Sequence, residues 1–426
     1  MAKKKNVEKA PREMTHRQLS HHKKAQRRQR IILFSGISII VAVILIILGG
    51  WFAGEYLPLH KTIFQVYDAK FNTAYLIDTL KIDGKSEGIS KMASNASGII
   101  NQIIQNEVLK QGAEKLGITV SDEEAKQLLE NNSIPVSDAG MAIARAQLLL
   151  GKLKSGHFTS LVPESDNQVY MKAMMIESDT LAKVVRERIA NGENFTMLAE
   201  KYATNYYFKI NQGDYGWHPA SILKNQLGST IPLDFAFNAD VKAGDLSTPL
   251  SDNASYKQLG YWLIRINDRP DEESANVSAI LLSSEAEALN IKARLEAGEE
   301  LAAIADNRSQ YSPSKEKHGE LGMVTTSENV TDTLNGYVFN PPTEVGKWSQ
   351  PVREDILYTQ GGAWLVQIVD KEDNMKLSDD DRKTLIDEAY NTWTSNLETA
   401  SLSTIRNDIT AEIQQWAIDR ATKELQ

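Results

Sequence analysis

The feature that most constrains this fold is a segment that occurs twice in the chain. The sequence GENFTMLA starts at Gly192, and a near copy, GEELAAIA, starts 106 residues later at Gly298. The same spacing relates GDYG, which starts at Gly213, to GELG, which starts at Gly319. A repeat of this length predicts that one structural unit was duplicated, because self-similarity at a fixed spacing is the signature of repeated units.

Two further motifs follow in the same order in both copies. Beyond the glycine motifs the second copy is four residues shorter, so that the spacing becomes 102 residues. GDLSTP, starting at Gly244, then corresponds to GKWSQP, and YWLIRIND, starting at Tyr261, corresponds to AWLVQIVD. Four matches in one order with a single change of length indicate a duplicated domain.

Each copy is predicted to form a compact α+β unit of roughly a hundred residues, which is a usual domain size. The copies open with the apolar stretches KAMMIES and SAILLSS and continue with two helices that are separated by a glycine turn. Each copy then closes on a strand whose apolar side chains alternate along one face. We therefore expect two units in tandem, over residues 169–271 and 275–372, each with its own closing strand.

An uncharged apolar stretch near the start predicts a membrane anchor. Residues 31–54 carry no charge, and about 20 apolar residues suffice to span a bilayer. This stretch is longer than the apolar part of a cleaved signal peptide, about 7–15 residues. Residues 1–30 hold eleven Lys or Arg against two acidic residues, which keeps them cytoplasmic. We expect an uncleaved signal anchor in a bacterial cell membrane, with Trp51 and Tyr56 at the outer interface; a buried core helix is the alternative.

The remaining chain is acidic, with 36 basic against 54 acidic residues. This charge disfavours nucleic acid as a partner, because affinity for nucleic acid comes largely from neutralising phosphates. The chain has no cysteine, which excludes disulfides, Cys-zinc sites and thiol catalysis. The acidic run Asp379–Asp381 lacks the spacing of a calcium loop and is predicted to be the first turn of a helix. We expect no cofactor and no metal.

Two helical segments flank the duplicated units. Residues 60–168 are predicted to be mainly helical, with an apolar face at three- and four-residue spacings from Ile99 to Leu109. Ser121 and Glu124 have the spacing of a capping box, and the short stretch FQVYDAKFN before these helices suits a strand. Residues 377–426 are again predicted to be helical, and the sequence leaves open where they pack.

The repeated pattern resembles the parvulin type of peptidyl-prolyl isomerase domain. The resemblance rests on GE-x-F-x-x-L-A, the G-D-x-G turn, G-(D/E)-x-S-x-P and the closing apolar strand. The second copy departs from this pattern at Leu301 and Lys347. NEVLKQGAEKLGITVSDEE, in the helical segment before the copies, is similar to the N-terminal domain of SurA-type and membrane-anchored PrsA-like foldases. The resemblance implies a foldase for secreted chains, with two parvulin units between helical segments.

The resemblance also implies where catalytic residues belong. Parvulins hold a proline ring in an apolar cup and surround the twisting amide with a hydrogen-bonding cluster. That cluster contains two histidines, one in each of the opening and closing strands, and a Cys or Asp after the second helix. These positions fall here on Ala173, Asn205 and Trp262 in the first copy, and on Ala279, Tyr311 and Trp364 in the second. Ala offers no side-chain hydrogen bond and an indole only donates, so the catalytic cluster is not reproduced.

Five apolar residues are candidates for binding substrate: Leu233, Phe237, Trp262, Leu334 and Phe339. The resemblance places Phe237 and Phe339 near the proline cup and Leu233 and Leu334 close to a second cup position. Trp262 and its counterpart Trp364 either plug the pocket or form an apolar floor for it. Packing in the core is the alternative interpretation for all of them. His218 and His318 are not at corresponding positions in the two copies, which speaks against a shared catalytic role.

Two classes of function fit this sequence. The first is an extracytoplasmic foldase or chaperone that binds unfolded or proline-containing polypeptides, with weak isomerase activity or none. The second is a scaffold without catalysis, whose degenerate parvulin units bind a partner in the cell envelope. The intact order of domains favours the first, and the replaced histidines favour the second.

Overall fold

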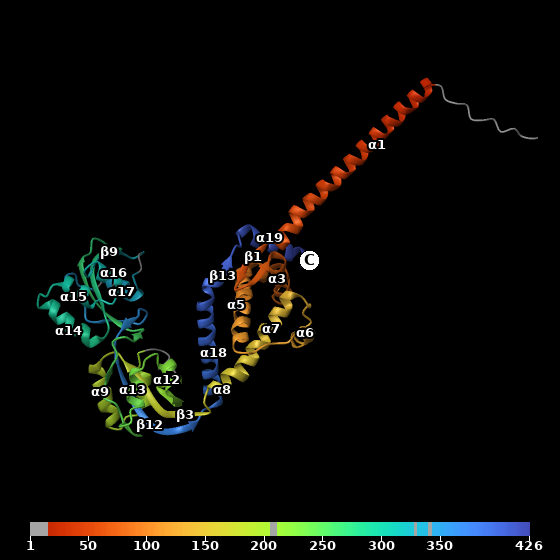
Figure 1. Cartoon of the computed structure of the whole chain (residues 1–426). Helices are drawn as coiled ribbons and strands as arrows, with labels where there is room; N and C mark the ends of the chain where they lie inside the picture. Colours follow the sequence, from red (N-terminus) through yellow and green to blue (C-terminus); the bar gives the residue numbers. More distant parts are fainter. Residues whose placement is uncertain (1–15, 205–210, 328–329, 340–342) are drawn as a thin grey trace, which may run out of the picture. The chain divides into compact units, whose positions relative to one another are not determined.

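The computed structural model describes residues 16–204, 211–327, 330–339 and 343–426 (Figure 1). The chain divides into two compact units. The first unit combines Met1–Thr159 with Ala389–Gln426, and the second is Ser160–Glu388. Helix α18 (Asp379–Ser401) passes from the second unit to the first. The chain thus leaves the first unit and returns to it.

The first unit begins with one long helix. Helix α1 (His16–Trp51) continues through a π-helical turn, η1 (Phe52–Tyr56), into α2 (Leu57–His60). The π turn has a local cause: Pro58 has no N–H to donate to the carbonyl of Gly54, and Leu57 N–H bonds instead to Phe52 O. Within this helix, Leu33–His60 is long and apolar enough to cross a membrane. This property agrees with the predicted anchor and leaves its topology open.

The rest of the first unit is helical around a small sheet. The stretch FQVYDAKFN forms a hairpin, β1 (Thr62–Val66) and β2 (Ala69–Asn72), with Tyr67 at φ 51° in the turn. The capping box of Ser121 and Glu124 is confirmed at the start of α6. The other helices are α3 (Thr73–Glu87), α4 (Ile89–Ser94), α5 (Ala96–Lys115), α6 (Asp122–Asn131), α7 (Asp138–Lys152) and α8 (Thr159–Leu161).

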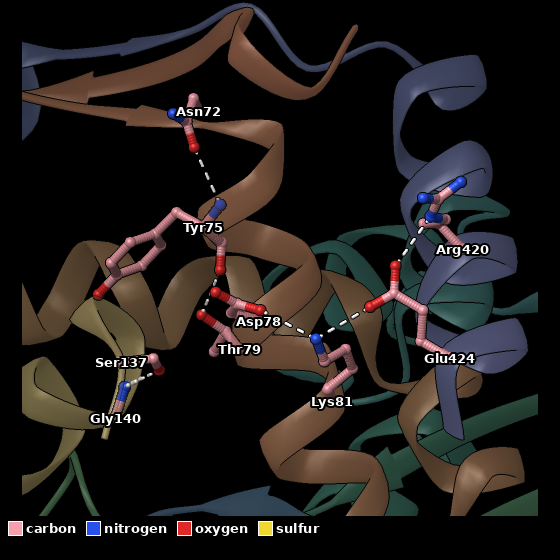
Figure 2. Close-up of polar contacts among 9 residues, drawn as sticks. All are labelled: Asn72, Tyr75, Asp78, Thr79, Lys81, Ser137, Gly140, Arg420 and Glu424. Atoms are coloured by element: carbon pink, nitrogen blue, oxygen red, sulfur yellow. Dashed lines mark hydrogen bonds and ion pairs between the residues drawn. The ribbon is translucent and has the colours of Figure 1, made fainter. Parts of the chain in front are cut away.

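The end of the chain completes this unit. Strand β13 (Ile405–Asn407) pairs with β1, and helix α19 (Ala411–Leu425) packs on α3 through Ala417, Ile418 and Ala421. Figure 2 shows the polar side of this contact: Lys81 on α3 bonds both Asp78 and Glu424. The C-terminal segment, whose packing the sequence left open, is therefore part of the N-terminal domain.

The second unit contains two four-stranded antiparallel sheets, each with helices. The host sheet has the order β4-β3-β12-β5, and the inserted sheet has the order β10-β7-β8-β9. The host elements are β3 (Ser165–Ile176), α9 (Asp179–Ala190), α10 (Phe195–Tyr202), β4 (Asp214–Pro219), α12 (Ala220–Leu227), α13 (Ile231–Ala236), β5 (Leu250–Ser251) and β12 (Ala363–Lys376). The inserted elements are β6 (Tyr256–Lys257), β7 (Gly260–Asp268), β8 (Ser274–Leu282), α14 (Glu285–Glu296), α15 (Leu301–Arg308), α16 (Ser312–Glu316), β9 (Glu320–Thr325), α17 (Asp332–Val338), β10 (Val352–Glu354) and β11 (Thr359–Gln360).

The strand pairing corrects the expectation that each copy closes on its own last strand. The closing strand of the first copy, β7, pairs with β8, the opening strand of the second copy. The closing strand of the second copy, β12, pairs with β3, the opening strand of the first copy. The two four-stranded sheets are therefore nested. Residues 256–360, which form the inserted sheet and a separate two-stranded sheet of β6 and β11, interrupt the chain that forms the host sheet.

The exchange has a physical explanation in the sequence of the two closing strands. YWLIRIND and AWLVQIVD present the same apolar alternation, so either strand fits the core face of either sheet. Only residues 269–273 separate β7 from β8, and a short connection of this kind favours an antiparallel hairpin between consecutive strands. Because β7 pairs with β8, β3 pairs with the other closing strand, β12.

The repeated G-x-x-S motif bonds to the exchanged strands. Ser247 donates its N–H to Val366 O at 2.8 Å, and its hydroxyl oxygen accepts the N–H of Val366 at 3.0 Å. Ser349 makes the same two bonds to Ile264, at 2.8 and 2.9 Å. In each sheet the serine hydroxyl thus accepts a backbone N–H of the closing strand that would otherwise lack a partner there. This shared role explains why the motif occurs in both copies.

Candidate functional site

The family's two histidine positions come together in each sheet, but from different copies. In the host sheet Ala173 faces Val366, and Met175 faces Trp364. Ala173 and Trp364 are therefore diagonal neighbours on one face, at a distance of about 7–8 Å between Cα atoms. The small alanine leaves room for the indole, so the two replacements compensate each other in volume.

The inserted sheet repeats this arrangement. Ala279 faces Ile264, and Leu281 faces Trp262. This pairing corrects the grouping expected from the sequence, which placed Ala173 with Trp262 and Ala279 with Trp364. Trp364 shares one hydrophobic core with Leu233 and Phe237, whereas Trp262 shares another with Leu334 and Phe339.

Both tryptophans bind a buried carboxylate. Trp364 donates its Nε1–H to Oδ2 of Asp252 at 3.0 Å, and Trp262 donates its Nε1–H to Oε2 of Glu354 at 3.0 Å. Asp252 is 2% exposed, and Glu354 is 0% exposed. The sequence reasoning missed these acids, although they lie 102 residues apart, the spacing that relates the two closing strands. The repeat therefore contained a signal for the indole–carboxylate pairs.

Asp252 is held in its charged form by several donors. Burial by itself raises the pKa of Asp252, but hydrogen bonds from Ser255, Trp364 and Ser229 outweigh burial and lower this pKa to about 2. The backbone N–H of Ser255 adds a further bond at 3.0 Å. Both carboxylate oxygens thus accept hydrogen bonds. In this geometry the carboxylate holds the indole and the turn after β5 in place.

The third family position differs between the copies. Tyr311, in the inserted domain, packs edge-on against Trp262 with ring centroids 5.2 Å apart, and burial raises its pKa. Asn205, its counterpart in the first copy, lies outside the described residues. An aromatic contact at Tyr311 fills space and does not act on a proton.

The apolar candidates differ in what they expose. Trp262, Trp364 and Leu334 are 0% exposed and Leu233 is 7% exposed, whereas Phe237 and Phe339 are half-buried. Phe237 and Phe339 are thus the accessible members of the set, whereas the tryptophans and leucines lie in the core.

His218 lies away from Trp364 in the host sheet. His218 in β4 faces Val169 and bonds Asp381 through Nδ1 at 2.9 Å. Val169 is six residues from Met175, the neighbour of Trp364, or about 20 Å along the strand. His318 bonds Asp306 at 2.8 Å. Each histidine is thus hydrogen-bonded to a carboxylate.

Within the part of the chain that the structure describes, the two histidine positions of each sheet do not form a hydrogen-bonding cluster. The indole N–H groups point to Asp252 and Glu354, and Ala173 and Ala279 have no polar side-chain atom. Among the described residues, no group of three or more His, Cys, Asp or Glu side chains is placed to hold a metal ion. At the four histidine positions the described side chains are therefore apolar or have their N–H bonded to a carboxylate.

Comparison with known proteins supports the assignment made from the repeat. A family model of the PPIC-type PPIase domain matches residues 261–372, from β7 into β12. Foldase protein PrsA 4 of Bacillus cereus is 27% identical over 254 residues, which is 54% of this chain and 80% of the relative. The chaperone SurA of Chromohalobacter salexigens is 33% identical over 96 residues, which is 22% of this chain and 19% of the relative.

Other relatives and solved structures are of the same kind. A parvulin-like PPIase of Rickettsia prowazekii is 26% identical over 42% of this chain and 63% of its own length. The crystal structure of the peptidylprolyl isomerase PrsA from Bacillus cereus overlaps 86% of this chain and 92% of that chain, at 11% identity and a TM-score of 0.25. Residues 261–372 thus match the PPIC-type PPIase domain family, and the chain as a whole is similar to PrsA and SurA-like foldases.

Proposed function

We propose that this protein is a membrane-anchored extracytoplasmic foldase that acts as a chaperone, and that its parvulin domains do not catalyse prolyl isomerisation. It would hold unfolded or proline-containing polypeptides after their export across a bacterial cell membrane. The observation that carries the proposal is the pair of fully buried tryptophans at the family's closing-strand histidine positions. Their N–H groups are occupied by Asp252 and Glu354, so nothing at these positions contacts a bound amide.

The first unit supplies a surface suited to an extended chain. A cavity of about 410 Å³ lies between α5, α7 and the end of α18. Its lining mixes apolar side chains such as Leu109 and Leu150 with the amides of Gln102, Gln105 and Gln147. Amides both donate and accept, so they match the backbone of an unfolded polypeptide of any sequence, while the apolar side chains contact its exposed hydrophobic residues.

The test of catalysis uses the full chain in detergent or nanodiscs. We expect proline tetrapeptides to isomerise at the uncatalysed rate. A rate above that background that is lost in Phe237→Ala or Phe339→Ala contradicts the proposal that these domains are inactive.

The test of chaperone activity measures how far the full chain slows aggregation of an unfolded client. We expect slowing by the unmodified chain and less slowing by Gln102→Leu combined with Gln147→Leu. Gln127→Leu, which replaces an exposed amide on α6, serves as the matched control. A chain that neither slows aggregation nor binds unfolded polypeptide is not a chaperone.

The scaffold alternative keeps one observation in its favour, namely that both domains have lost both histidines. It predicts that the full chain co-purifies with a membrane or envelope partner in fixed proportion and leaves client aggregation unchanged. Those two results together would replace the chaperone proposal.

The anchor and its topology can be tested because the chain has no cysteine of its own. A cysteine at Met197, which is 71% exposed, should react with a membrane-impermeant maleimide in intact cells or spheroplasts. A cysteine at Ala2 should react only after the membrane is opened. The reverse pattern would contradict the proposed orientation.

A further inference from the structure

A second cavity lies where the end of the long helix meets α19 within the first unit. It has a volume of about 600 Å³ and is lined mainly by apolar atoms. One wall is the end of the long helix, with Ala53, Leu57 and His60 at spacings of four and three residues. The facing wall is the first half of α19, with Ile413 and Trp416.

The walls of this cavity are fixed by polar contacts. Arg420 on α19 forms an ion pair with Glu55 at 2.8 Å, which ties the two helices together one turn beyond Trp416. Thr73, which is 1% exposed, donates its N–H to Lys61 O at 3.2 Å at the other end. The cavity therefore lies between tethered elements.

The length of the helix places this cavity at the membrane surface. Leu33–His60 comprises 28 residues, or about 42 Å of helix, against about 30 Å of hydrocarbon and about 40–45 Å of bilayer with its headgroups. The last turns of the helix, which form the wall, thus lie among the headgroups of the outer leaflet. Leu57 is 51% exposed and Phe52 is 46% exposed there, which suits an interface rather than bulk water.

The charges at the cavity match one class of ligand. Lys61 and Glu412, whose carboxylate also accepts a hydrogen bond from Thr410, are a cation and an anion in a lining that is otherwise mostly apolar. A zwitterionic phospholipid has the complementary pattern: a phosphate for Lys61, an amine for Glu412 and an acyl chain for Leu57, Ile413 and Trp416. We propose that this cavity binds a zwitterionic phospholipid of the outer leaflet and thereby seats the first unit on the membrane. The inference rests on the proposed anchor.

The test uses the full chain in nanodiscs of a zwitterionic phospholipid whose acyl chains carry bromine near the glycerol. Bromine quenches tryptophan fluorescence on contact. All variants carry Trp51→Phe, which removes the indole expected within the bilayer interface. We expect brominated lipid to quench this background and Trp416→Phe to abolish most of the quenching. Trp393→Phe, which removes an indole packed on Phe158, is the matched control and should leave the quenching in place.

A second measurement separates binding in the cavity from simple closeness to the membrane. Ile413→Trp fills the cavity, whereas Gln415→Trp adds the same side chain to an exposed position of α19 that does not line it. After transfer to lipid-free detergent, we expect phospholipid to remain with the unmodified chain and with Gln415→Trp, and to be lost from Ile413→Trp.

Three results would overturn the inference. The first is quenching that Trp416→Phe leaves unchanged, and the second is equal retention of phospholipid by Ile413→Trp and Gln415→Trp. The third is displacement of the lipid by an apolar peptide from an exported protein, because the peptide would then be the occupant. Extraction at alkaline pH distinguishes a failure of the anchor. A chain released from membranes has no anchor, whereas a chain that stays in membranes without quenching lacks only the lipid site.

Discussion

At the scale of residues, the ionisation of Asp252 makes the free energy of unfolding depend on pH in the acid range. Its folded-state pKa of about 2 lies below the ordinary value of 3.8, so the charged form stabilises the fold. This stabilisation is complete above about pH 4 and is lost as the pH falls towards 2, an effect of about 2 kcal/mol. We expect Asp252→Asn to be less stable at neutral pH and to lose less stability than the unmodified chain between pH 4 and 2. Urea unfolding at each pH measures this; Asp240→Asn, at an exposed position, should keep the original profile.

The charged form of Lys257, unlike that of Asp252, destabilises the fold. Its side chain is 0% exposed and donates to the carbonyl oxygen of Gly361. Burial lowers its pKa from 10.5 to about 8, against the attraction of Glu177 and Glu287. Below pH 8 the folded state holds a buried ammonium, and this cost is relieved as the pH rises from 8 to 10.5. We expect the free energy of unfolding to rise by about 2–3 kcal/mol over this range relative to Lys257→Met, measured by denaturant titration. Equal slopes in the two proteins would show that the lysine is not buried as described.

At the scale of elements, the exchanged closing strands can be tested by cross-linking. Ala173 and Val366 face each other with their backbone N–H groups turned to other partners, Gly213 and Ser247. Such a pair has Cα atoms about 4.5 Å apart, within the range that a disulfide accepts. In this cysteine-free chain we expect Ala173→Cys with Val366→Cys to oxidise to one intramolecular disulfide during refolding, as shown by gel mobility and peptide mapping.

The control for this cross-link is the pairing that tandem units would require. Ala173→Cys with Ile264→Cys joins the opening and closing strands of the same copy and should stay reduced. The reciprocal pair, Ala279→Cys with Ile264→Cys, should oxidise, because these residues face each other in the inserted sheet. Oxidation of the same-copy pair instead would mean that the strands are not exchanged.

At the scale of the whole molecule, nesting predicts which part of the chain can be removed. Gly361 donates its N–H to Ser255 O at 2.9 Å, so the two ends of the inserted segment 256–360 lie side by side. Joining Ser255 to Gly361 keeps all four strands of the host sheet and the Trp364–Asp252 bond. We expect this shortened protein to fold and unfold cooperatively, as monitored by circular dichroism.

Deletion of residues 275–372, the boundary suggested by the sequence repeat, provides the comparison. It removes β8 and most of β12, and leaves β3 and β7 without their central partners. We expect this protein to aggregate, because unpaired strand edges associate with other chains. Similar stability of the two deletions would contradict the nested arrangement.

The sequence alone determined the features that depend on local patterns. The two-residue alternation of the closing strands, the capping box at Ser121 and the uncharged stretch after the basic tail predict elements that need few distant contacts to form. The repeat also predicted two copies of one α+β fold, and the replaced histidines at Trp262 and Trp364 followed from the same alignment.

The tertiary structure alone decided which elements belong together. The closing strands are nearly equivalent in sequence, so no local pattern states that Trp364 shares a core with Phe237 and Trp262 with Phe339. Strand partners are chosen by the short connection after β7 and by the cores that the strands share. The indole–carboxylate bonds to Asp252 and Glu354 depend on that choice, because each joins residues more than ninety positions apart in the chain. Local propensity acts over a few residues, whereas the site of this protein is assembled across its length.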